Sequence, residues 1–364
     1  RVYLDKIRLT SYLYTYRHGF ALCRFIFYCN KQQNKASEEN SMNNVTIIQL
    51  FFLRFFNLMS IVLSYIYSVL FKKVKVAPMP FSINIEPTNK CQLSCPECPT
   101  GMNQIPVNKG EMNLNVFEKL ISSIYKQVFY INLYFQGEPL LNKHIIDMIK
   151  LARKHRMYVV LSTNAQIIDE KRAEELVLSG LSKIIVSMDG ITDSSYQKYR
   201  VGGQLTKVKD AIVLLNKAKQ QYRKNKLRIV AQFLVNRYNE HEISEFLQWA
   251  KNNKVKPTLK SMQLYSDFTF LPQNEKLRRY SFVNNNWVLK RSKKNRCFRI
   301  WKQCVIRYNG DVLPCCFDKY AQYVVGNINE ENLSNIWLSE KFTSFRYNIL
   351  MNKNSVLMCT NCTE

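Results

Sequence analysis

The segment "EPTNKCQLSCPECPTG", residues 86–101, decides what this sequence folds into and which chemistry it carries. It places Cys91, Cys95 and Cys98 at spacings of four and three residues, directly after the alternating apolar run 81–86. No histidine or fourth cysteine lies nearby, and such spacings indicate a metal site. A zinc site would require four ligands, whereas a 4Fe-4S cluster held by three thiolates keeps one iron open. The spacing therefore favours a cluster that binds a further molecule.

Apolar runs rich in strand-forming residues alternate with helical patterns from residue 81 onward. The predicted strands are 81–86, 129–135, 158–162, 183–188, 228–235 and 257–264, and the predicted helices are 114–126, 143–154, 170–179, 205–222 and 240–252. Strands separated by helices predict parallel βα units. Six units are fewer than the eight of a closed barrel, so we predict a partial (β/α)6 barrel. A doubly wound sheet is the alternative, but its glycine-rich fingerprint is missing.

Polar residues follow several of the predicted strands. They form "QGEP" at 136–139, "STNA" at 162–165 and "SMDG" at 187–190, and Gln232 and Asn236 interrupt the fifth run. Any one of these segments is weak evidence, because loops are polar anyway. In a barrel, however, chemistry sits at the carboxyl ends of the strands. Several polar segments at corresponding positions therefore predict a site at this rim.

The Cys-x3-Cys-x2-Cys motif after the first strand of a six-unit barrel resembles the radical S-adenosylmethionine (radical SAM) enzymes, over residues 80–265. The resemblance implies that Cys91, Cys95 and Cys98 hold a catalytic 4Fe-4S cluster whose open iron chelates S-adenosylmethionine. Reductive cleavage then gives a 5'-deoxyadenosyl radical, which abstracts hydrogen from the substrate. A low-potential electron donor such as flavodoxin or ferredoxin is implied as a partner.

The resemblance also implies residues that bind S-adenosylmethionine. They are Gly137, Glu138 and Pro139, on the family's Gly-Gly-Glu-Pro segment, with Ser162, Asn164, Ser187, Asp189 and Arg200. Two positions depart from the family pattern. Gln136 replaces the first glycine, and Glu97 stands where an aromatic residue usually packs beside the adenine. The adenine therefore needs another neighbour.

The C-terminal third resembles the SPASM and twitch extensions of the same family. Cys297, Gly310 and Cys315 match its Cys-x9-15-Gly-x4-Cys pattern, and "MCTNC" supplies Cys359 and Cys362. The resemblance implies an auxiliary 4Fe-4S cluster on these four cysteines. Four-cysteine zinc is the alternative, because zinc sites also close with Cys-x2-Cys. Cys304 is predicted to be a core residue, as is Cys316 unless it replaces Cys315 as a ligand.

The N-terminal region raises separate questions. The first methionine is Met42, so we expect translation to start there and residues 1–41 to be untranslated or disordered. Residues 45–71 are apolar and aromatic, and lysines follow them. A helix packed on the body or lying on a membrane surface fits this run better than a spanning helix, because its uninterrupted apolar part is short.

The net charge and the distribution of the cysteines indicate which partners and which cellular compartment to expect. The chain has 53 Lys and Arg against 27 Asp and Glu, a net charge of +26, but the lysines are dispersed. Nucleic acid is therefore not the expected partner. The cysteines, 11 in all, cluster in groups, which predicts metal binding in a reducing compartment such as the cytoplasm. Membrane association through the N-terminal apolar segment is part of this expectation.

The predicted organisation is an extension at 1–41, an apolar helical segment at 42–79, the radical SAM core at 80–265, a linker at 266–296 and the auxiliary-cluster domain at 297–364. The predicted function is radical SAM modification of a peptide or protein. A carbohydrate or other small-molecule substrate is the alternative, and a non-catalytic iron-sulfur or zinc protein is a third hypothesis. Fold-level similarity does not choose among these substrates.

Overall fold

The computed structural model of the protein describes residues 45–105, 108–265, 267–290 and 294–363. The predicted extension 1–41 lies outside these residues. The chain divides into two compact units, 1–53 and 54–364, and the boundary falls within helix α2 (Ile47–Phe71). The second unit contains the strands of the sheet and the predicted metal-binding cysteines.

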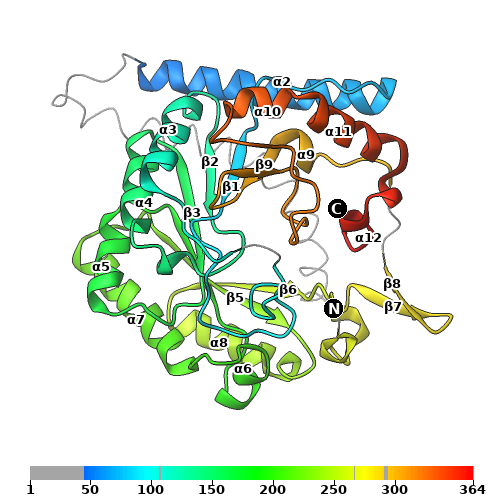
Figure 1. Ribbon diagram of the computed structural model, residues 1–364. Helices are drawn as coiled ribbons and strands as arrows, with labels where there is room; N and C mark the ends of the chain where they lie inside the picture. The colour runs from blue at the N-terminus through cyan, green and yellow to red at the C-terminus, as the bar shows by residue number, and fades with distance from the viewer. Residues whose placement is uncertain (1–44, 106–107, 266, 291–293, 364) are drawn as a thin grey trace. The chain divides into compact units, whose positions relative to one another are not determined.

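A mostly parallel sheet forms the centre of this unit (Figure 1). Among the described residues, nine strands follow the order β11-β10-β9-β1-β2-β3-β4-β5-β6. The strands from β1 to β6 are all parallel to their neighbours. Their bounds are β1 (Ser82–Ile85), β2 (Tyr130–Leu133), β3 (Tyr158–Thr163), β4 (Lys183–Ser187), β5 (Arg228–Val235) and β6 (Lys256–Ser261). The six parallel strands predicted from the apolar runs are therefore confirmed.

Helices connect these strands and cover the sheet from outside (Figure 1). They are α3 (Leu114–Ile124), α4 (Ile145–Lys154), α5 (Glu170–Leu178), α6 (Asp193–Tyr199), α7 (Leu205–Gln221) and α8 (Ile243–Asn252), with short 3-10 turns η2 (Pro139–Leu141) and η3 (Glu240–Glu242). Side-chain caps start several of them, and Asn113 and Asp169 accept backbone N–H groups at the starts of α3 and α5. The sequence did not reveal α6, because two turns are too short for apolar periodicity to show.

The C-terminal residues extend the same sheet. β9 (Gln303–Ile306) pairs in parallel with β1, and β10 (Asp311–Leu313) and β11 (Gly326–Asn327) follow in antiparallel pairing. Every residue of β9 is buried, including Cys304, which agrees with its prediction as a core residue. The remaining elements are α9 (Arg299–Lys302), α10 (Leu333–Leu338), α11 (Glu340–Asn352), η6 (Lys353–Ser355) and α12 (Leu357–Thr360).

The stretch 266–296, predicted to be a linker, has secondary structure of its own. It contains the turns η4 (Phe268–Phe270) and η5 (Glu275–Leu277) and the hairpin of β7 (Tyr280–Val283) and β8 (Asn286–Leu289). Asn284 and Asn285 turn the hairpin with φ angles of 49° and 59°, as a two-residue turn of the primed type requires. Asn-Asn is a weaker sequence signal for such a turn than Asn-Gly.

Polar side chains fasten α2 to the body. The Arg54 guanidinium donates to the carbonyl oxygens of Tyr125, His155 and Arg156, at 2.7–3.1 Å. Asn57 donates to the carbonyl of Met79 at 3.2 Å. These contacts satisfy carbonyls that end α3 and α4, so the helix is held by directional bonds in addition to apolar packing.

We expect Arg54→Ala to lower the free energy of unfolding by about 3 kcal/mol, because it leaves buried carbonyl groups without donors. Urea unfolding of the full chain measures this change. Lys119→Ala, an exposed change on α3, is the control and should stay within about 0.5 kcal/mol of the parent. Equal stability of the two variants would contradict the anchoring role of Arg54.

Candidate functional site

The loop that carries Cys91, Cys95 and Cys98, here called the cysteine loop, begins where β1 ends. Side-chain hydrogen bonds to the Gly110 backbone hold its first residues. Thr88 Oγ1 donates to the Gly110 carbonyl at 2.6 Å, and Asn89 Oδ1 accepts the Gly110 N–H at 2.8 Å. Further along, a Cβ on Gly101 would lie 2.6 Å from the Cys95 nitrogen, so only glycine permits this approach. The loop therefore has a defined path, and its three thiols keep fixed places along it.

Two thiols of this loop contact side chains from other loops, one after β3 and one after α6. Asn164, just after β3, directs its Nδ2 at Cys91 Sγ at 3.8 Å, and Arg200 directs Nη1 at Cys95 Sγ, also at 3.8 Å. Burial raises the pKa of Cys91 to about 11 and also raises that of Cys95, against the opposing effect of Arg200. The structure thus brings Cys91 and Cys95 together with Asn164 and Arg200.

Gly137, Glu138 and Pro139 lie between the cysteine loop and β3. Gly137 has a φ of 71°, and a Cβ there would lie 2.4 Å from the Thr88 carbonyl oxygen. The buried Glu138 carboxylate accepts the Thr163 hydroxyl and the Asn164 N–H, both at 2.7 Å. Burial raises the pKa of Glu138, and these hydrogen bonds oppose the rise. Pro139 is buried at the start of η2. Glu138 therefore fixes the end of β3 beside the cysteine loop.

Asp189, just after β4, forms an ion pair with Arg200, the residue that caps the end of α6. Asp189 Oδ2 lies 2.6 Å from both Nε and Nη2 of Arg200, and its Oδ1 accepts the Leu234 N–H of β5 at 2.7 Å. The Asp189 side chain is fully buried. Because Asp189 engages two donors of the guanidinium, the third, Nη1, faces Cys95.

Ser162 and Ser187 lie on one face of the sheet. Ser162 pairs with Ile185, two residues before Ser187, and Ser187 pairs with Gln232. Alternate residues of a strand share a face, so these side chains point into the barrel interior beside Asn164 and Asp189. Val160, Ile185 and Val230 form an apolar cluster deeper on the same face. The rim end of the interior is thus polar, and a small apolar cluster on β3, β4 and β5 lies next to it on the same face.

Glu97 has a structural role in place of the aromatic contact that the family pattern has at this position. Its carboxylate is buried and accepts the N–H groups of Tyr265 and Asp267, at 2.6 and 2.7 Å. These residues follow β6, so Glu97 joins the cysteine loop to the far end of the sheet. The sequence showed that Glu97 was unusual but gave no sign of its partners.

Further residues that the sequence reasoning missed surround the site. Gln92 exchanges hydrogen bonds with the Asn164 side chain at 3.2 and 3.3 Å. Asn239 donates to the Asp189 carbonyl at 2.9 Å. Both are side-chain amides in loops, and nothing in their local sequence distinguishes them from ordinary turn residues.

The four C-terminal cysteines predicted to hold the auxiliary cluster are buried. Cys297, Cys315, Cys359 and Cys362 are each less than a tenth exposed, whereas Cys316 is half-buried. The neighbouring Cys316 thiol and burial raise the pKa of Cys315 well above its usual value, and Cys297 contributes to the rise. Cys359 and Cys362 share one turn, in which the Cys362 N–H donates to the Cys359 carbonyl. The effects of Cys316 and Cys297 on the pKa of Cys315 indicate that these three thiols lie near one another.

The turn of Cys359 and Cys362 meets the rim of the barrel. Asn361, between them, donates to the Leu264 carbonyl at 2.5 Å and accepts the Tyr280 hydroxyl at 2.6 Å. Tyr320 packs edge-on against Tyr265, with ring centroids 6.4 Å apart. Leu264 and Tyr265 follow β6, so the C-terminal residues lie at the carboxyl ends of the strands.

The donor set at the cysteine loop fits an iron-sulfur cluster. Within the described ranges, no three His, Cys, Asp or Glu side chains converge on a point where one ion would bind. A cubane does not need such convergence, because each thiolate binds a different iron atom. Cys91, Cys95 and Cys98 are free, and the close approach at Gly101 and Gly137 shapes a cradle beside them. The buried Gln136 Nε2 beside them has no hydrogen-bond partner.

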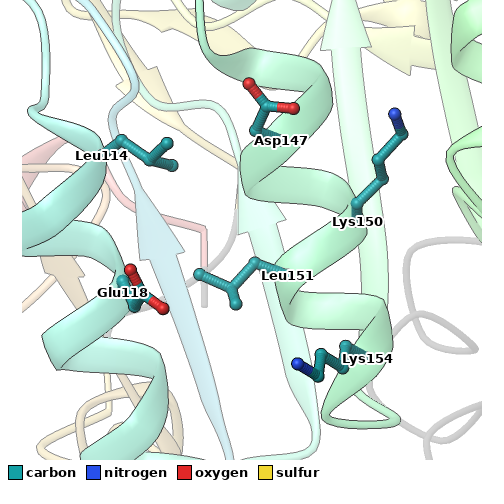
Figure 2. A pocket seen from close by; sticks show the side chains of 6 residues that line it. All are labelled: Leu114, Glu118, Asp147, Lys150, Leu151 and Lys154. Atoms are coloured by element: carbon teal, nitrogen blue, oxygen red, sulfur yellow. The ribbon is translucent and has the colours of Figure 1, made fainter.

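A hollow elsewhere on the molecule is separate from this site. Its volume is about 450 Å³, and the residues that line it, labelled in Figure 2, are Leu114, Glu118, Asp147, Lys150, Leu151 and Lys154. All six residues belong to α3 or α4, in the outer helical layer. None of the six is among the site residues described above, so this hollow is not assigned to the site.

Comparison with known proteins gives two domain matches. Residues 85–250 match the Radical SAM superfamily, and residues 297–363 match SPASM, an iron-sulfur cluster-binding domain. The two matched ranges together include most of the chain. They also contain all of the cysteines singled out above.

Curated relatives match over most of their own length. A tungsten-containing aldehyde ferredoxin oxidoreductase cofactor-modifying protein from Pyrococcus furiosus is 24% identical over 77% of this chain and 86% of the relative. An S-adenosyl-L-methionine-dependent 2-deoxy-scyllo-inosamine dehydrogenase from Niallia circulans is 24% identical over 78% and 92%. A PqqA peptide cyclase from Gluconobacter oxydans is 23% identical over 73% and 79%.

The fold is also that of a solved structure. SuiB of Streptococcus suis, bound to S-adenosylmethionine, aligns with a TM-score of 0.58 at 15% identity, over 74% of this chain and 68% of SuiB. The domain matches and the relatives agree with the cysteine pattern and the partial barrel. The chain therefore belongs to the radical SAM superfamily, as an enzyme that uses S-adenosylmethionine and 4Fe-4S clusters and carries a C-terminal SPASM domain.

Proposed function

We propose that this enzyme removes a hydrogen atom from a peptide or protein substrate held at the carboxyl-end rim of the barrel. The observation that carries the proposal is a pair of contacts to the cysteine sulfurs. Asn164 Nδ2 lies 3.8 Å from Cys91 Sγ, and Arg200 Nη1 lies 3.8 Å from Cys95 Sγ. These contacts join the cluster thiols to side chains suited to bind S-adenosylmethionine. A cluster held by these thiols would, when reduced, supply the electron for cleavage of S-adenosylmethionine and so the radical chemistry for hydrogen abstraction.

In this proposal the chain's own residues hold and orient the reactants. Cys91, Cys95 and Cys98 hold the cluster. Arg200 receives the methionine carboxylate through Nη1, because Asp189 already engages its other donors. Gly137, Glu138 and Pro139 shape the wall beside the methionine amino group, and Ser162, Asn164 and Ser187 offer hydrogen bonds to the ribose and carboxylate.

A peptide substrate has two lines of support. The relative from Gluconobacter oxydans is named a PqqA peptide cyclase and is matched over 79% of its length. In addition, β6 is the last strand of the described sheet, and it is mostly only partly buried. An extended peptide can add to such an edge through main-chain hydrogen bonds.

A small hydroxylated substrate is the second candidate. The relative from Niallia circulans is a dehydrogenase of 2-deoxy-scyllo-inosamine. The interior face of the sheet carries Asn84, Asn132, Gln232 and Thr258, which can pair with hydroxyl groups. In either case we propose a low-potential flavodoxin or ferredoxin as the electron donor and the reducing cytoplasm as the compartment, where free thiols persist.

A substrate screen separates the two candidates. The reconstituted enzyme is incubated without oxygen with S-adenosylmethionine and either the peptides encoded beside its gene or 2-deoxy-scyllo-inosamine. We expect a peptide to accelerate 5'-deoxyadenosine formation and to change in mass. Acceleration by the aminocyclitol alone would replace the peptide proposal with the second candidate. Absence of any S-adenosylmethionine cleavage would point to a non-catalytic metal protein.

We expect Cys95→Ala to abolish 5'-deoxyadenosine formation, because two thiolates do not hold the cluster that must bind S-adenosylmethionine. Chromatography of the reduced, anaerobic reaction measures the product. Cys304→Ala is the matched control, since Cys304 is a buried core residue of β9 and is not one of the predicted cluster ligands. The Cys304→Ala variant should still cleave S-adenosylmethionine. Undiminished cleavage by the Cys95→Ala variant would contradict the assignment of the cluster.

For the C-terminal module, we expect Cys359→Ala combined with Cys362→Ala to reduce iron from about eight to about four atoms per chain, as loss of one of two four-iron clusters requires. Cleavage of S-adenosylmethionine should remain measurable while product formation collapses, because an oxidised product needs an electron acceptor near the rim. Iron analysis and product assays measure the two effects. Unchanged iron in the variant, or zinc in the parent, would make the module structural.

A further inference from the structure

One face of α2 is apolar and exposed to solvent. In the second compact unit this face carries Phe56, Met59, Leu63, Ile66, Tyr67, Leu70 and Phe71. Phe56, Leu63 and Leu70 are exposed by 61%, 62% and 69%. Their spacing of seven residues places them in one stripe along the helix. The exposed stripe runs for four turns. Apolar residues on an ordinary protein surface are scattered singly, so a continuous stripe of this length is unusual.

The opposite face of α2 is buried and mixes polar with apolar side chains. Arg54, Asn57, Ile61, Ser64 and Ser68 are each less than a tenth exposed and recur every three or four residues. Ser68 exchanges hydrogen bonds with the Lys75 backbone, at 2.9 and 3.0 Å. A surface helix of a soluble protein ordinarily places its most apolar face against the core and its polar residues outside. In α2 several polar residues lie on the buried face, where they hold the helix together with the packing of Ile61 and Tyr65, while the face with Leu63, Ile66 and Leu70 is exposed.

The buried face also argues against a helix that spans a membrane. In the described part of the chain, α2 is long and apolar enough to do so, with a mean hydropathy of 1.8, but only by length and composition. Spanning would separate Arg54 from the three carbonyl groups that bind it and would place its charge in hydrocarbon. Lying flat keeps these bonds and buries only the outer stripe.

The charge next to the stripe favours a lipid surface over a second copy of the chain. Lys72 and Lys73 follow the helix and are exposed, and Lys75 lies over the ring of Tyr67, with Nζ 5.5 Å from the centroid. The whole chain carries a net charge of +26. Two copies meeting through this face would bring like charges together, whereas an anionic membrane attracts them.

We propose that α2 is an interfacial helix that docks the enzyme on an anionic lipid surface. Phe56, Leu63 and Leu70 enter the boundary between headgroups and acyl chains, and Lys72 and Lys73 pair with lipid phosphates. An apolar face combined with basic residues supplies the two signals that stable but reversible attachment needs. Docking in this way keeps the contacts of Arg54 and Asn57 that hold the helix to the body.

Vesicle sedimentation of the full-length holoenzyme tests the proposal. We expect binding to phosphatidylcholine vesicles that contain phosphatidylserine, weaker binding without phosphatidylserine, and release as salt is raised. The variant Phe56→Ser, Leu63→Ser, Leu70→Ser should lose at least about tenfold in partitioning. Lys72→Glu with Lys73→Glu should remove the dependence on phosphatidylserine.

The control carries the same kind of change on other helices. Leu178 on α5 and Val213 on α7 are also exposed, so Leu178→Ser with Val213→Ser should leave vesicle binding unchanged. Circular dichroism and urea unfolding confirm that each variant is folded. The proposal is overturned by absence of vesicle binding, by equal binding of the stripe variant and the control, or by attachment that resists alkaline carbonate. A dimer that the stripe variant abolishes, without vesicle binding, would assign the face to a second copy.

Discussion

The parallel pairing of β1 to β6 is the constraint on which the site depends. It brings the carboxyl end of every one of these strands to the same rim, so that loops distant in sequence meet there. Two buried acids then join neighbouring strand ends. Glu138, after β2, accepts the N–H that follows β3, and Asp189, after β4, accepts an N–H of β5. The carboxylates are thus part of the frame as well as of the reaction site.

The electrostatics of the rim follow from its burial. Removal from water disfavours charge on the Cys91, Cys95 and Glu138 side chains, while the Arg200 guanidinium is held charged by Asp189. Thiols bind iron as thiolates, so loading of the cluster must release protons from this loop. The positive charge of Arg200 beside Cys95 favours that release and stays in place for an anionic group of the bound cofactor.

The sequence predicted the parts of the fold and site that have local signals. Apolar runs located β1 to β6, and cysteine spacing located Cys91, Cys95 and Cys98. The pairing of β9 with β1, the contacts of Glu97 with Tyr265 and Asp267, and the bond of Asn361 to Leu264 were not predicted. Each of these joins residues far apart in the chain, and a four-residue strand or a loop side chain gives no local sign of its partner. The Gln92 to Asn164 pair was missed for the same reason.

The pairing of β9 with β1 also has a consequence for how the chain folds in the cell. Ser82 pairs with Gln303, so the edge of β1 that β9 covers stays open until the last part of the chain emerges from the ribosome. At typical synthesis rates this interval lasts roughly ten to forty seconds. An open edge beside a buried strand invites pairing with other nascent chains. Chaperones that shield unfinished sheets are therefore expected to determine how much of this enzyme reaches its native state.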